Sequence, residues 1–172
     1  MTAACLKKFA KENTKTNAVS IKAILSAELT PTNISVINAN FNSWHDRMCS
    51  DVSYGMRYGI WQKFINMTFK YLYCFEALGS THIGIIWNEC HCPIDSVIAR
   101  RAAGLMLTYG IPDPHHMAES IANSGSYELT WNNITNITPS FQYNEFQDII
   151  NDLCLRQVPN IPSKLFFDFL YW

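Results

Sequence analysis

The sequence lacks several features that would assign it to a specialised class of protein. Its six cysteines include no CxxC pair and are too sparse for a disulfide framework. No stretch approaches the roughly 18 apolar residues of a membrane-spanning helix, and "MTAACLKKFAKENTKTN" contains no apolar region of a signal peptide. Repeats and low-complexity segments are absent as well. We therefore expect a cytoplasmic protein with reduced thiols and no membrane partner.

The residues that are present indicate one packed domain. The chain has 172 residues, of which 48% are apolar and 13% aromatic. A chain of this length buries enough surface to be stable without disulfides. We expect a single helical domain over residues 1–172, with residues 1–16 as a flexible basic N-terminus.

Helical periodicity predicts an all-α fold with short connections. The longest helix is expected from Gly59 to Leu78, with an inward stripe formed by Ile60, Phe64, Met67, Tyr71 and Phe75. Shorter helices are predicted over residues 19–29, which Pro31 is expected to end, from an N-cap at Asn42 or Ser43 to Gly55, and within residues 94–110, 111–125, 140–157 and 162–172.

The charges divide unevenly along the chain. Residues 1–101 carry 11 of the 13 Lys and Arg and 7 of the 14 Asp and Glu, a net +4, whereas residues 102–172 are net −5. A basic half of this kind is typical of a surface for a polyanion, although ordinary solvated faces produce it too.

Two short segments contain residue types that are typical of anion binding and catalysis. In "GIWQKFIN", Gly59 lies four residues before Lys63, where a turn that opens a helix directs backbone amides at an anion such as a DNA phosphate. In "PIDSVIAR", Asp95 opens a second helix that continues to Arg100 and Arg101. A carboxylate there is also the ordinary cap of a helix.

Together these segments resemble the helix-hairpin-helix DNA glycosylases. That superfamily has a hairpin G-V-G-x-K and, later, V/I-D-T/S-x-V followed by an arginine. The lysine-to-aspartate separation of 32 residues and a second lysine, Lys70, seven residues after Lys63 are most similar to the archaeal 8-oxoguanine glycosylase branch. The resemblance covers about residues 55–110, and Trp61 stands where the family has its second hairpin glycine.

The resemblance implies a fold, an activity and a set of roles. The glycosylase-like core would span about residues 40–172, with a helix-hairpin-helix-like element before the Lys63 helix. Lys63 would attack the sugar C1′ as a neutral amine, and Asp95 would stay ionised and stabilise positive charge on the sugar. No four-cysteine cluster motif is present, so neither an iron–sulfur cluster nor another cofactor is implied. The partner would be duplex DNA that contains a modified base.

Further residues receive roles by the same resemblance. Gly59, Trp61, Lys70, Arg100 and Arg101 are the expected DNA contacts. The flipped base would lie against Met67, Asp168 and Trp172, where aromatic stacking and a hydrogen-bond acceptor are needed. Core packing is the competing explanation for the last two.

Other constellations leave alternatives open. His45 and Cys49 together with Cys90, His91 and Cys92 contain zinc-ligand types, but their spacing matches no zinc motif and buried cysteines are common in cores. A second hypothesis is a helical module that binds DNA through its basic half without catalysis. A third is a helical interaction protein that docks through the aromatic C-terminus "KLFFDFLYW".

Overall fold

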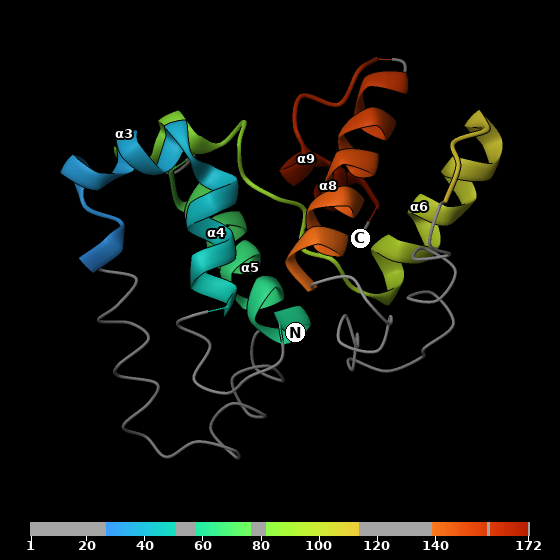
Figure 1. Cartoon of the computed structure of the whole chain (residues 1–172). Coiled ribbons are helices and arrows are strands. Elements are labelled where there is room, and N and C mark those ends of the chain that lie inside the picture. The colour runs from blue at the N-terminus through green and yellow to red at the C-terminus, as the bar shows by residue number, and fades with distance from the viewer. Residues whose placement is uncertain (1–26, 51–57, 77–81, 114–138, 158, 172) are drawn as a thin grey trace.

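A computed structural model describes residues 27–50, 58–76, 82–113, 139–157 and 159–171. Within these ranges the chain forms helices and no strand, which confirms the expected all-α class (Figure 1). The helices are α3 (Pro31–Ala39), α4 (Phe41–Ser50), α5 (Tyr58–Glu76), the 3₁₀ helix η1 (His82–Ile86), α6 (Ser96–Tyr109), α8 (Pro139–Arg156) and α9 (Lys164–Tyr171). The N-terminus, most of the helix expected at 19–29, the chain at 51–57 where a hairpin would lie, and the helix expected after Asp113 are outside the described residues.

Helix α3 was not among the predicted helices, and α4 begins before the predicted N-cap position. Pro31 does not merely end a preceding helix, because it occupies the first turn of α3, whose Thr30 cap accepts a hydrogen bond from the Asn33 amide at 3.2 Å. Proline suits that position since its missing N–H has no partner there in any case. Asn42 lies inside α4, and the backbone carbonyl oxygen of Asn40, which precedes the helix, accepts from the Trp44 amide at 3.0 Å.

Helix α5 buries a different stripe from the predicted one. Trp61, Ile65 and Phe69, each four residues apart, are almost fully buried, whereas Tyr71 and Phe75 are 38% and 64% exposed. The expected inward stripe is therefore wrong over its C-terminal half, although Met67 is buried. Adjacent rows of this helix are both apolar, and contact with α4 decides which of them faces the core.

The buried row gives a direct test of the packing. Trp61→Ala should lower the free energy of unfolding by about 3–5 kcal/mol, because it removes a buried indole and leaves a cavity. Phe75→Ala should change it by no more than about 0.5 kcal/mol, since that ring is largely in solvent. Urea unfolding of both variants measures the difference, and equal losses would contradict the packing described for α5.

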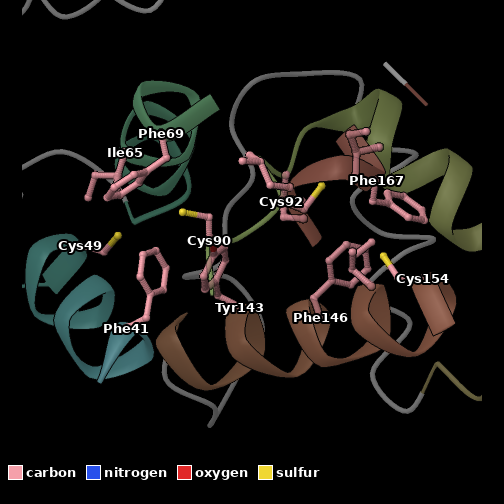
Figure 2. Close-up of a cluster of buried hydrophobic side chains, with 14 of the residues drawn as sticks. Phe41, Cys49, Ile65, Phe69, Cys90, Cys92, Tyr143, Phe146, Cys154 and Phe167 are labelled. Carbon is pink, nitrogen blue, oxygen red and sulfur yellow. The ribbon is translucent and has the colours of Figure 1, made fainter. Parts of the chain in front are cut away.

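An extended segment, residues 90–95, crosses the core and leads into α6. Figure 2 shows Cys90 and Cys92 of this segment, with Tyr143 of α8, between two groups of apolar side chains. One group comes from α4 and α5 (Phe41, Cys49, Ile65, Phe69), and the other from α8 and α9 (Phe146, Cys154, Phe167). The segment thus brings the start of α6 to the side of α5.

Candidate functional site

The structure brings Lys63 and Asp95 together. The Lys63 Nζ lies 2.9 Å from the Asp95 Oδ2, and the two side chains are only 6% and 10% exposed. They come from the second turn of α5 and the N-terminus of α6, which are 32 residues apart in the chain. A charge pair this well covered is held by direct contact and hydrogen bonding, because little water reaches it.

Asp95 divides its two oxygens between two tasks. Its Oδ1 accepts hydrogen bonds from the backbone amides of Val97 at 2.9 Å and Ile98 at 3.0 Å, which caps α6. Its Oδ2 faces Lys63. The cap fixes the carboxylate in one orientation at the positive end of the helix dipole. The ordinary capping role and the role implied by the family resemblance are therefore compatible.

A second buried ion pair lies close to the first. Lys70, two turns along α5, binds the carboxylate of Asp168 on α9, and its Nζ is 4.8 Å from the centre of the Phe169 ring. Burial raises the pKa of Asp168, and the hydrogen bond from Lys70 opposes that shift. The charges of Asp95 and Lys63 also act on Asp168, so the two pairs influence each other.

Two of the expected DNA contacts lie inside the protein. Gly59 is buried in the first turn of α5, and Trp61 is a core residue whose Nε1 donates to the carbonyl oxygen of Met48. The expectation that Trp61 faces a phosphate is corrected, because its ring packs at 5.3 Å against Phe64 and is covered by protein. Lys70 is likewise engaged by Asp168 and is not presented on the surface as a phosphate contact.

The remaining predicted site residues fall into three groups. Arg100 and Arg101 are exposed on α6, and the guanidinium carbon of Arg101 lies 4.5 Å from the centre of the Tyr171 ring. Met67 is buried one turn after Lys63. Trp172 lies outside the described residues.

Beside the lysine pairs lies a polar network that connects α4, α5, α8 and the segment 90–95, and all of its members are buried except Asn42 at its outer end. Asn66 of α5 accepts from the His45 Nε2 at 3.1 Å and donates to the Tyr143 hydroxyl at 2.6 Å. The Tyr143 hydroxyl donates to the His91 Nδ1 at 3.0 Å, and the His91 Nε2 donates to the Asn42 Oδ1 at 2.7 Å. These partners assign the neutral Nε2–H form to both histidines.

The same network includes the histidines among the zinc-ligand types noted in the sequence. His45 and His91 are joined to hydrogen-bond partners, and within the described ranges no three His, Cys, Asp or Glu side chains are grouped so that they would hold a metal ion. The thiol of Cys49 is 3.6 Å from the His45 Nδ1, and burial raises the pKa of Cys49. This cluster is therefore built as hydrogen-bonded core.

Sequence patterns missed several residues around the site. Gln62, Tyr143 and Gln147 are buried polar groups, yet each stands in a helical stretch where its local context resembles a solvent face. Only one weak sign in the sequence points to buried polar groups here. Gln62 and Asn66 are four residues apart, a spacing that places their two amides on the same face of the helix.

No family model, curated protein or solved structure matches this chain. In the part of the chain that the structure describes, no helix has the length and apolar character required to cross a membrane.

Proposed function

We propose that the protein is a DNA glycosylase that removes an oxidised or otherwise modified base from duplex DNA, with Lys63 as nucleophile and Asp95 as its acidic partner. The observation that supports this most is the contact of 2.9 Å between a buried amine and a buried carboxylate that belong to different helices. The resemblance of the two segments that supply these groups to helix-hairpin-helix glycosylases adds to it.

In the proposed reaction, the Lys63 ammonium first gives up a proton, and the Asp95 carboxylate is placed to accept it. The Nζ lone pair then forms a bond to the sugar C1′ while the bond from C1′ to the base breaks, and the base leaves with that electron pair and takes up the proton held by Asp95, which returns the carboxylate to its ionised form. Positive charge develops on the sugar and is stabilised by the ionised carboxylate. Ring opening would yield a Schiff base between Lys63 and the sugar, from which β-elimination gives the lyase activity.

The proposal places the DNA on the side of α6. Arg100 and Arg101 are exposed cations within two turns of Asp95, and they would contact phosphates next to the flipped nucleotide. Met67 and Asp168 lie on the elements that carry the two lysine pairs and would border the extruded base.

Asp95→Asn tests the chemistry with little disturbance of the fold. Asparagine caps helices as well as aspartate does, so the bonds to Val97 and Ile98 should persist. The negative charge opposite Lys63 is lost, and we expect base release in a single turnover to fall by about 100-fold or more. The measurement uses a panel of duplexes, each with one modified base, and follows release of the base and strand cleavage.

Asp152→Asn is the matched control, because this exposed carboxylate bridges to Arg156 on the outer part of α8 and should leave the rate unchanged. If Asp95→Asn released the base as fast as the parent protein does, the assigned role of the carboxylate would be refuted. Thermal melting of each variant checks that the cap, and with it α6, is retained.

A second candidate is a helical module that binds DNA without catalysis, and the exposed Arg100 and Arg101 beside a capped helix favour it. In that case the parent protein binds duplex DNA with steep salt dependence, no panel member loses its base, and Asp95→Asn changes neither result.

A further inference from the structure

The extended segment before Asp95 is held by a side chain from α5. The Gln62 carboxamide contacts both backbone polar groups of Ile94: its Nε2 donates to the carbonyl oxygen at 3.0 Å, and its Oε1 accepts from the amide at 3.4 Å. The same Nε2 donates to the Gly59 carbonyl oxygen, and the same Oε1 accepts from Asn66. Both ends of the Gln62 carboxamide are therefore hydrogen-bonded inside the protein.

A side chain from α8 makes the same kind of contact two residues earlier. The Gln147 Oε1 accepts from the Cys92 amide at 3.0 Å, and its Nε2 donates to the Cys92 carbonyl oxygen at 2.7 Å. Pro93, which lies between the two clamped residues, has no N–H to satisfy. Two glutamines thus satisfy both polar groups of Cys92 and of Ile94, as a neighbouring strand would in a sheet.

The double clamp, formed by the Gln62 contacts with Ile94 and the Gln147 contacts with Cys92, lies directly beside the ion pair. Ile94 is bonded directly to Asp95, and Gln62 is bonded directly to Lys63. The contact between Gln62 and Ile94 therefore joins the backbones of α5 and of the segment one residue away from the contact between Lys63 and Asp95. Gln147 fixes the same segment from the opposite helix.

We propose that Gln62 and Gln147 are positioning residues that set the separation of the Lys63 amine and the Asp95 carboxylate. This inference rests on the proposed function, since it supplies the geometry in which the carboxylate takes the lysine proton. Without the carboxamides, both polar groups of Cys92 and of Ile94 lose main partners inside the protein, and the segment shifts to find others. A displacement of about 1 Å at a reacting pair costs on the order of 100-fold in rate.

Gln62→Met and Gln147→Met, each made alone, remove the carboxamide and keep the length of the side chain. The first readout needs no DNA: proton exchange of the Lys63 ammonium, followed by ¹⁵N NMR on the free protein, is slow while the buried pair is closed. We expect exchange to become about tenfold faster or more in both variants, because the pair opens more often. Leu153→Ala is the matched control, since it costs comparable stability on α8 but removes no hydrogen bond.

The second readout is single-turnover base release from the modified duplex. We expect the rate to fall by about 10- to 100-fold in both glutamine variants, with the Kd for the duplex changed by less than about twofold, and the Leu153→Ala rate to match the parent. A parent protein that releases no base refutes the proposed glycosylase, and the exchange experiment then still decides whether the clamp holds the pair. The positioning role is overturned if proton exchange of Lys63 stays as slow as in the parent in both glutamine variants. It is also overturned if exchange in Leu153→Ala is as fast as in the glutamine variants.

Discussion

Lys63→Gln should abolish the covalent adduct that borohydride traps between the protein and duplex DNA with a modified base. Glutamine has no nucleophilic amine, so the bond to C1′ and the Schiff base that borohydride reduces are both lost. We expect the trapped product to fall by a factor of about 1,000 or more, because no other group takes over covalent catalysis. Glutamine keeps a donor near the Asp95 Oδ2, which limits the cost of leaving a buried carboxylate without its cation.

Lys164→Gln is the control that makes this result specific. Lys164 is half-buried at the start of α9, and burial lowers the pKa of its amine, a change that favours a lysine nucleophile. The nearby charged or ionisable groups that act on it are Asp148, Glu89 and two cysteines, and Asp95 is not among them. If Lys164→Gln lost the adduct and Lys63→Gln kept it, the nucleophile would lie on α9 and not on α5. That result would refute the proposed site.

The ion pair was predictable from the sequence, whereas the structure that supports it was not. Lys63 and Asp95 each stand in a segment with local signs of its own, a glycine before a lysine and a carboxylate at a helix start. Gln62 and Gln147 carry no such sign, because their partners are backbone atoms of a segment that is distant in the chain. Nothing in a single sequence shows which carboxamide meets which backbone.

Local rules also explain where the predicted fold failed. Pro31 was expected to end a helix, and helical residues do stop at Glu28 before it, but the helix α3 that this proline opens was not predicted, although a proline is well suited to a first turn. On α5, apolar residues occupy two neighbouring rows, so periodicity establishes a helix without establishing its inner face. The packing of α4 against Trp61 settles that choice.

Two neutral histidines make the core sensitive to acid. Burial lowers the pKa of His45 to about 3 from an ordinary 6.5, and the hydrogen bond to Asn66 opposes that shift. Burial also lowers the pKa of His91 well below 6.5, and the charge of a protonated His45 would lower it further. In both rings the Nδ1 faces a donor, the Cys49 thiol or the Tyr143 hydroxyl, so an added proton has no acceptor without rearrangement.

The folded state should therefore lose stability as the pH falls from about 6.5 toward 3. Above pH 6.5 both histidines are neutral in the folded and the unfolded chain, and they contribute no pH dependence. Below pH 6.5 the unfolded chain binds two protons that the folded chain does not bind. The free energy of unfolding therefore falls by about 1.4 kcal/mol per pH unit for each histidine. Between pH 6 and pH 4 the free energy of unfolding should drop by on the order of 5 kcal/mol, as measured by urea unfolding at a series of pH values.

His45→Gln isolates the histidine contribution from that of the carboxylates, which also titrate near pH 4. A glutamine amide can donate to the Asn66 Oδ1 as the His45 Nε2 does, but it takes up no proton. Because the carboxylates are the same in both proteins, the difference between the two slopes reports His45 alone. We expect the variant to be less stable than the parent at pH 7, where the imidazole packs well, yet to lose about 1.4 kcal/mol less per pH unit between pH 6 and 4. Parallel slopes for the two proteins would mean that the folded chain accepts a proton on His45 as readily as the unfolded chain does, and the stacking of His45 on Tyr143, with ring centres 5.0 Å apart, would then have to accommodate an imidazolium.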